Sequence, residues 1–128
     1  MRFARNFVAS ILALAPLGPV AAHHSVATFD LNRTLSLRGA VKFFQWSNPH
    51  CWIEILVPTD NGTKEWSIEM GSTTEMYRRG WRPHTLRAGE TVTIHVYPAR
   101  DGSPGVLFDS AEGPDGAPLG KPKPAHAP

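Results

Sequence analysis

The chain contains a single cysteine, Cys51, among its 128 residues. A lone thiol excludes an intramolecular disulfide and every site built on a Cys-x-x-Cys pair, such as four-cysteine zinc sites and thioredoxin-like redox centres. Cys51 lies in a stretch where apolar and polar residues alternate, and a buried free cysteine behaves as a small hydrophobic residue. We therefore expect the fold to depend on its hydrophobic core or on a bound ligand, with Cys51 inside the core.

The sequence also has no apolar run of transmembrane length. The apolar segment Phe7–Leu17 is too short for a permanent anchor, which needs roughly 20 apolar residues. Arg2 and Arg5 precede this segment and the small residues Val20–Ala22 follow it, as in a secretion signal. The sequence therefore predicts a signal peptide over residues 1–22. It also predicts a periplasmic or secreted bacterial protein that meets the membrane only transiently, during export.

The excess of charge of either sign is small. The chain has 13 Lys and Arg against 11 Asp and Glu, a formal net charge of +2, although its pI is about 9.0. Removal of the signal takes away Arg2 and Arg5, and 13 less these two leaves 11 basic against 11 acidic residues. Binding to a phosphate backbone relies on a basic surface. On this ground we expect no nucleic-acid partner.

Cleavage after Ala22 makes His23 the first residue of the mature chain, followed by His24. A terminal histidine offers its amine and its ring nitrogen to one metal ion, and a planar set of nitrogen donors suits Cu(II). His50, which follows the turn at Asn48–Pro49, is the candidate for a further imidazole ligand. We therefore predict a copper site formed by His23, His24 and His50. The alternative is that the terminal pair is a remnant of cleavage and that His50 caps a strand.

Alternation of apolar and polar residues predicts five strands. Asn61-Gly62 is a hairpin signal between two of them, and Gly39 in the first strand indicates a bulge or sharp bend. Between the third and fourth strands, Ser72 and Glu75 form a capping-box pattern that predicts a short helix ending near Gly80. The predicted strands cover residues 35–43, 51–57, 65–70 and 92–97, and the fifth begins at 106–108.

Three strands, a helix and two strands form the element order of an OB-fold. This fold is a mainly β, five-stranded Greek-key barrel, here with one short helix between strands 3 and 4. A sandwich of two sheets is the structural alternative. We place the single domain at residues 23–112. Residues 113–128 are rich in Pro and Gly, a composition that predicts a disordered tail.

Tryptophan and arginine residues form a second group of candidates. Trp46 and Trp52 flank the turn that leads to His50, and exposed aromatic side chains on such a barrel can stack on sugars or bases. Arg78 and Arg79 offer guanidinium groups, which hold carboxylates or phosphates through paired hydrogen bonds. These four residues are the candidate ligand-binding set. The alternatives are burial of the tryptophans and a solvated helix end for the arginines.

Several separated motifs occur together in one order along the chain. They are His23-His24-Ser25, Trp46-Ser47-Asn48-Pro49-His50, Glu69-Met70-Gly71-Ser72, Arg78-Arg79-Gly80-Trp81 and Ala99-Arg100-Asp101-Gly102-Ser103. Through these motifs the sequence resembles an uncharacterised bacterial family of small exported proteins, a domain of unknown function, over residues 22–112. The resemblance implies an exported, mainly β protein. It supplies no activity, so it assigns no functional residues.

No catalytic set stands out in the sequence. The serines lack the context of a nucleophile elbow, and the glycines form no phosphate-binding loop. We therefore expect a binding protein without catalytic residues, whose partner is copper, a small ligand or another periplasmic protein. One alternative is a ligand- or protein-binding module that uses its Trp and Arg surface without metal. The other is a metal-dependent hydrolytic or redox enzyme.

Overall fold

The structure is a computed structural model that describes residues 26–123. All five predicted strands and the predicted helix are present. The predicted signal peptide, residues 1–22, lies outside the described residues. Within them, no helix is both long and apolar enough to span a bilayer. The elements are η1 (Val26–Thr28), β1 (Leu35–Gln45), β2 (Trp52–Thr59), β3 (Gly62–Glu69), α1 (Thr73–Arg78), β4 (Thr91–Tyr97) and β5 (Gly105–Glu112).

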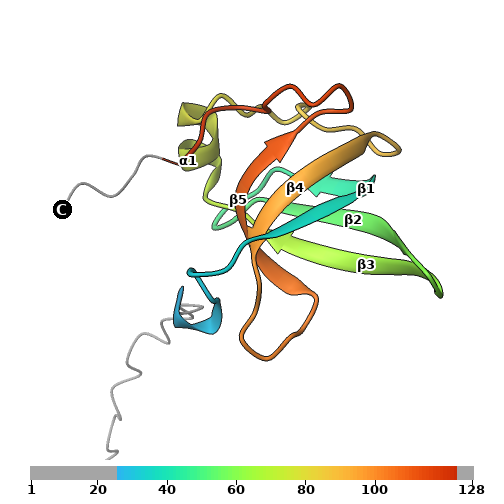
Figure 1. The fold of residues 1–128 in the computed structure, drawn as a ribbon. Helices are drawn as coiled ribbons and strands as arrows, with labels where there is room; N and C mark the ends of the chain where they lie inside the picture. Colours follow the sequence, from blue (N-terminus) through green and yellow to red (C-terminus); the bar gives the residue numbers. More distant parts are fainter. Residues whose placement is uncertain (1–25, 124–128) are drawn as a thin grey trace, which may run out of the picture.

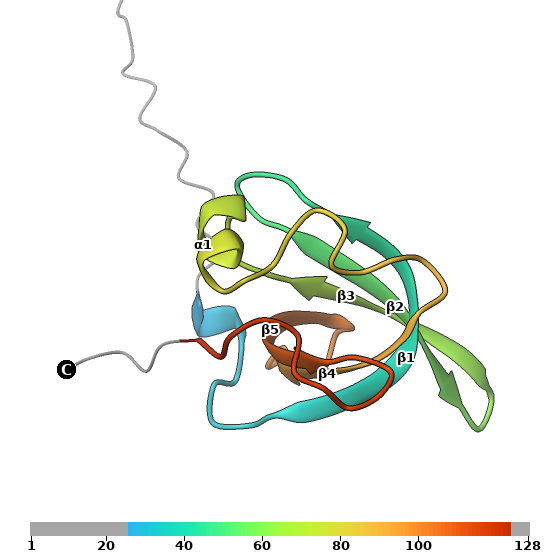
Figure 2. The same cartoon turned by 90° about the horizontal axis from the view of Figure 1, so that it is seen from above.

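The strands close into a barrel in the order β1-β2-β3-β5-β4 (Figure 1 and Figure 2). Strand β1 closes it, because its first half pairs with β4 and its second half pairs with β2, with Ala40 in both pairings. Neighbouring strands are antiparallel except β3 and β5, which run parallel over Ser67–Glu69. Five strands in this closed order, with the helix between β3 and β4, are an OB-fold. The predicted fold is confirmed, and the alternative of a two-sheet sandwich is wrong.

Gly39 lies where β1 passes from one partner strand to the other. A Cβ atom at this position would overlap the backbone carbonyl oxygen of Leu56 in β2. The pairing of β1 with β2 then shifts its register between Val41 and Phe43, as at a β-bulge. The absence of a side chain therefore allows two backbones to approach closely at this corner of the barrel.

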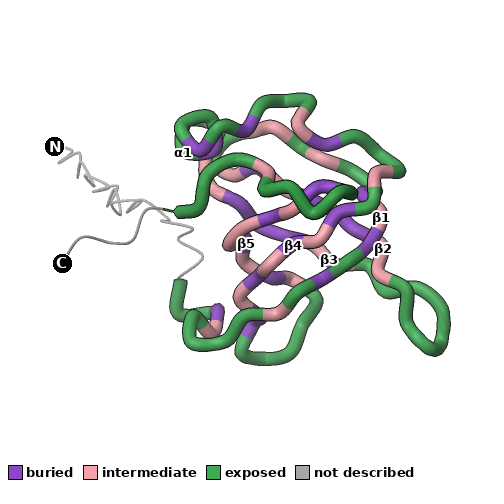
Figure 3. The backbone as a smooth tube through the Cα atoms, turned by 45° about the horizontal axis from the view of Figure 1, so that its top comes forward, coloured by how far each residue is buried: buried purple, intermediate pink, exposed green. Residues whose placement is uncertain are grey.

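The core follows the alternation of the strands. Ile53 and Ile55 are fully buried, whereas Trp52 before them and Glu54 between them are only partly buried. Figure 3 shows the same alternation of buried and more exposed positions along the barrel strands. Cys51 belongs to the core with 0% exposure, as expected, and burial raises the pKa of its thiol.

Helix α1 is short and capped at both ends. The Ser72 hydroxyl accepts a hydrogen bond from the Glu75 N–H at 3.2 Å, which confirms the predicted N-cap. Gly80 has a φ of +88°, and the N–H groups of Gly80 and Trp81 bond back to carbonyls of the last turn in a Schellman arrangement. The chain therefore turns sharply after the helix, and Trp81 is fully buried in the core.

The segment 113–123 differs from the prediction of a disordered tail over residues 113–128. Its Leu119 N–H donates to the Ala111 carbonyl at 2.8 Å, and its Lys121 N–H donates to the Arg79 carbonyl at 2.7 Å. The Leu119 side chain also packs against the core. One apolar contact and these backbone bonds hold the segment against β5 and α1, which composition alone does not reveal. Residues 124–128 lie outside the described residues.

Candidate functional site

A pocket of about 520 Å³ lies where segments distant in sequence meet. Its wall takes residues from η1 and the chain after it, the loop before β2, the end of β3, α1, the strands β4 and β5, and residue 123. This volume lies within the range of roughly 300–1,000 Å³ that is typical of small-molecule sites. The wall combines apolar and ionisable groups. The polar residues used below are His50, Glu69, Glu75, Arg79, Tyr97 and Asp109.

The loop that carries His50 is held in place by hydrogen bonds at both ends. The Asn48 side-chain oxygen accepts from the Thr73 N–H at 3.1 Å and from its hydroxyl at 2.9 Å, which ties the loop to the start of α1. The Asn48–Pro49 peptide bond is cis. The Ser47 hydroxyl donates to the His50 carbonyl at 3.0 Å. These contacts fix the backbone at His50, so the position of its ring is set by the fold.

The His50 ring contacts a buried carboxylate. Its Nδ1 atom lies 2.7 Å from Oε1 of Glu69, whose side chain is only 10% exposed, against 37% for the histidine. With Nδ1 engaged by the carboxylate, Nε2 is the ring nitrogen that remains for a ligand. A carboxylate on one imidazole nitrogen orients the ring, as is common for metal-binding histidines.

Arg79 lies on another side of the same pocket. It is 5% exposed, its Nε donates to the Lys121 carbonyl at 3.1 Å, and its Nη2 donates to the Asp109 carbonyl at 2.5 Å. Its guanidinium also lies 5.0 Å from the Phe108 ring. Burial lowers the pKa of Arg79, while the nearby carboxylates of Glu75 and Asp109 act in the opposite direction.

The Asp109 carboxylate accepts two hydroxyl hydrogen bonds. The Tyr97 hydroxyl donates to Oδ1 at 2.9 Å and the Ser110 hydroxyl donates to Oδ2 at 3.1 Å. The bond to Asp109 raises the pKa of Tyr97, because it stabilises the protonated phenol. Both carboxylate oxygens are therefore satisfied by neutral donors.

The pocket brings together two of the predicted site residues, His50 and Arg79. Arg78 is exposed, and Trp46 and Trp52 are partly buried. None of these three lines the pocket. The four residues of the predicted ligand-binding set thus do not form one surface, since Arg79 points into the fold where its neighbour Arg78 faces solvent.

The other predicted metal ligands, His23 and His24, lie outside the described residues. Within residues 26–123, no group of three or more His, Cys, Asp or Glu side chains is arranged to hold a metal ion. Cys51 is no substitute, because it is buried among apolar residues and burial disfavours its thiolate form. A metal site at His50 therefore needs ligands other than the side chains that residues 26–123 place there.

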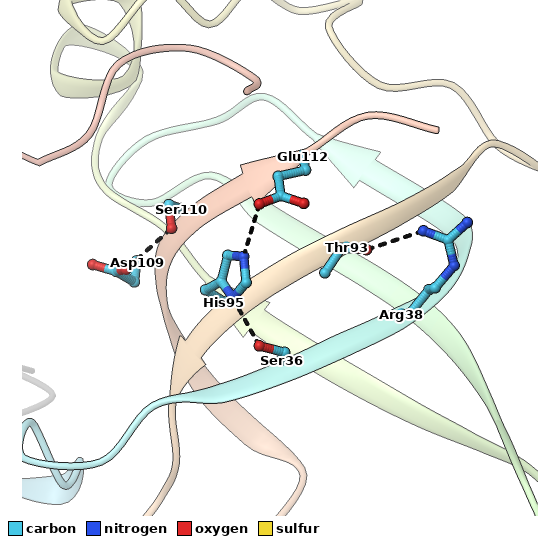
Figure 4. Close-up of polar contacts among 7 residues, drawn as sticks. All are labelled: Ser36, Arg38, Thr93, His95, Asp109, Ser110 and Glu112. Carbon is cyan, nitrogen blue, oxygen red and sulfur yellow. Dashed lines mark hydrogen bonds and ion pairs between the residues drawn. The ribbon is translucent and has the colours of Figure 1, made fainter. Parts of the chain in front are cut away.

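A second polar cluster lies on the outer face of β1, β4 and β5 (Figure 4). Ser36 Oγ is 2.8 Å from His95 Nδ1, and His95 Nε2 is 3.4 Å from Glu112 Oε1. Serine, histidine and a carboxylate recur in hydrolytic triads. In those triads, however, Nε2 faces the serine and Nδ1 faces the carboxylate, which is the reverse of the arrangement here. Ser36 and His95 are direct partners in the β1–β4 register, so ordinary cross-strand pairing accounts for the contact. The sequence did not reveal this cluster, because strand alternation gives the face of a residue and not its partner.

The solved structures similar to this chain include two of the mitochondrial single-stranded DNA binding protein Rim1 from S. cerevisiae, in different crystal forms. One has 14% identity and a TM-score of 0.48, and the match covers 70% of this chain and 95% of that chain. The other has 12% identity and a TM-score of 0.48, with 71% and 97% covered. At this identity the likeness concerns the fold alone. No curated protein matches the sequence.

These structures correct one expectation. We expected no nucleic-acid partner because the charges of the mature chain balance, yet proteins named for binding single-stranded DNA are built on a similar barrel. Net charge is a sum over the whole surface, and it excludes no local basic site. The exclusion of nucleic acid was therefore wrong.

A family comparison agrees with the resemblance drawn from the motifs. The match runs over residues 12–108, which is most of the chain and includes the loop of His50, the helix with Arg79 and the first four strands. The description of that family gives no activity, so it assigns no role to the pocket. The chain belongs to the family of unknown function DUF6152.

Proposed function

We propose that this protein is an exported binding protein that holds Cu(II) at the first residue of its mature chain. Removal of residues 1–22 makes His23 the amino terminus, whose amine and ring nitrogen chelate one ion. His24 and His50 supply further nitrogen donors, a set that suits Cu(II). Its place of action is then the periplasm or the cell exterior.

The observation that carries this proposal is that Val26 and His50 line the same pocket. Only two residues, His24 and Ser25, stand between His23 and Val26, and an extended chain spans at most roughly 3.3–3.6 Å per residue. Three residue steps limit the reach of His23 to about 10 Å from the Val26 backbone, and Val26 lines the pocket that His50 also lines. So short a tether gives the terminal ligands a high effective concentration at the histidine ring.

The contact between His50 and Glu69 supports the same site. The carboxylate is nearly buried, it holds Nδ1 at 2.7 Å, and it leaves Nε2 for a metal ion. Partners of this kind change metal affinity by about 10- to 100-fold when they are removed. Glu69 is thus the positioning residue of the proposed centre.

The test is a Cu(II) titration of the mature protein by calorimetry, after its first residue has been fixed by intact mass. His50→Ala is expected to weaken binding at least as much as removal of a supporting partner does, about 10-fold or more. His84→Ala is the matched control, because His84 is exposed and does not line the pocket. Equal affinity of the two variants would remove His50 from the site.

Two further changes test the remaining ligands. Acetylation of the His23 amine removes one of the two donors of the terminal chelate, so we expect a large loss of affinity and fewer nitrogen couplings in the Cu(II) electron paramagnetic resonance spectrum. Glu69→Gln is expected to weaken binding by about 10- to 100-fold. Its control is Glu65→Gln, at a carboxylate that is 46% exposed and pairs with Lys42. Unchanged Cu(II) affinity in the acetylated protein refutes the terminal chelate.

A further inference from the structure

Arg79 is a buried cation that forms no ion pair with a carboxylate of the described part of the chain. Its exposure is 5%, and none of the ion pairs found among residues 26–123 includes it. Charged side chains are rarely buried unless they are paired, because removal of the charge from water is unfavourable. The guanidinium is therefore the group in this pocket that has most to gain from an anion.

Only part of the guanidinium is used by the protein. Nε and Nη2 donate to the carbonyls of Lys121 and Asp109, which are neutral acceptors. A guanidinium has five N–H donors in a planar fork that matches the two oxygens of a carboxylate. No bond from its Nη1 is present among the described residues, so donors remain for a ligand.

The carboxylates of the pocket are placed so that they leave this charge incompletely balanced. Glu69 is engaged by His50 at 2.7 Å. Asp109 accepts hydroxyl hydrogen bonds on both oxygens, and its contact with Arg79 is through the backbone carbonyl. Glu75 is exposed on α1, where water screens its charge.

We propose that the pocket binds a small organic carboxylate, with the carboxylate on Arg79 and an apolar body against the wall. Phe29, Leu31 and Leu107 supply that wall, and all three line the same pocket of about 520 Å³. A buried cation beside apolar side chains selects an anion with a hydrophobic part over a purely hydrophilic one. This site goes beyond the copper centre and does not depend on it.

The test compares benzoate with benzamide on the metal-free mature protein by calorimetry. The two probes have the same ring and size, and only benzoate carries a charge. Benzoate is expected to bind about 10- to 100-fold more tightly, which corresponds to one charge-assisted hydrogen-bond pair. Equal binding of the two probes, or no binding of benzoate, would overturn the proposal. Because no metal is present, failure here leaves the copper titration unaffected.

Two variants locate the site. Arg79→Lys keeps the charge and loses the planar fork, and it is expected to weaken benzoate binding by about 10-fold or more, whereas Arg78→Lys on the exposed face is not. Leu107→Trp fills the pocket while leaving Arg79 in place, so it is expected to abolish benzoate binding with the circular dichroism spectrum unchanged. Benzoate affinity that survives both variants contradicts the assignment, and the second variant keeps the test valid if the first does not fold.

Discussion

Substitution of Gly39 by alanine tests the account of how the barrel closes. A Cβ atom here would meet the Leu56 carbonyl oxygen, its carbonyl carbon at 2.9 Å and Val57 Cγ2 at 3.1 Å. The two nearest of these atoms are backbone. They cannot rotate away, because Ala40 and Leu56 are paired in the register next to the contact. Relief therefore requires β1 and β2 to separate.

The magnitude follows from two opposing terms. Insertion of a methyl group into a closely packed site costs about 1–3 kcal/mol. Replacement of glycine by alanine returns about 0.4–1 kcal/mol, because the unfolded chain has fewer conformations to lose. The net destabilisation is about 1–2 kcal/mol, which for a domain of roughly 100 residues lowers the Tm by about 4–15 °C.

Thermal unfolding followed by circular dichroism measures this change. Gly105→Ala in β5 is the matched control, since its added Cβ meets nothing within 4 Å and its φ is not positive. We expect the control to be neutral or slightly stabilising. If Gly39→Ala unfolds at the same temperature as Gly105→Ala, the close approach at Leu56 does not constrain the barrel, and the reasoning is refuted.

Three further outcomes follow from buried polar groups. Trp81 is fully buried and its indole N–H has no hydrogen-bond partner among the described residues, so Trp81→Phe should cost less in urea unfolding than Trp81→Ala, for which about 3–5 kcal/mol is expected. Cys51 should react with a thiol reagent only after unfolding. Burial raises the pKa of its thiol in the folded protein. The contribution of this thiol to the free energy of unfolding is therefore complete below the unfolded thiol pKa and is lost as pH rises through the folded value. The hydrogen bond to Asp109 raises the pKa of Tyr97 in the folded protein. The contribution of this phenol to the free energy of unfolding is therefore complete below the unfolded tyrosine pKa and is lost as pH rises through the folded value. Tyr97→Phe should accordingly reduce the loss of unfolding free energy at alkaline pH. A Tyr97→Phe protein with the same alkaline slope as the parent would contradict the last of these.

Local patterns were sufficient for most of the fold. The alternation around Ile53 and Ile55 predicted β2 because period-2 burial is a property of the strand itself. Ser72 and Gly80 predicted the ends of α1, since caps involve neighbours a few residues apart. The order of these elements then limited the architecture to a barrel or a sandwich, and β1 pairs with both β2 and β4, which closes the barrel.

The site needed contacts that no local pattern contains. The contact of His50 with Glu69 depends on how the loop before β2 meets the end of β3, 19 positions later. Arg78 and Arg79 are equivalent in the sequence, yet one is exposed and the other is buried, because the Schellman turn and residues 113–123 cover only one side of the helix end. Residues 113–123 are a second example. Their composition indicated disorder, yet the N–H groups of Leu119 and Lys121 donate to the carbonyls of Ala111 and Arg79, which are distant in sequence or belong to another element.

The segment just before β1 matters most for the proposed copper site, because contacts distant in sequence fix its position. The Arg100 N–H donates to the Thr28 carbonyl at 3.0 Å, its Nε donates to the Ala27 carbonyl at 3.0 Å, and Phe29 forms a bridge with Ala99. Val26 is therefore a defined part of the pocket wall. A short chain joined to such a fixed point can reach only a small volume, and the proposed ligands before Val26 would start from the wall of the pocket that His50 also lines. An amino-terminal ligand would be far less effective if the chain entered at an unfixed point, because the entropy of closing the site would then oppose binding.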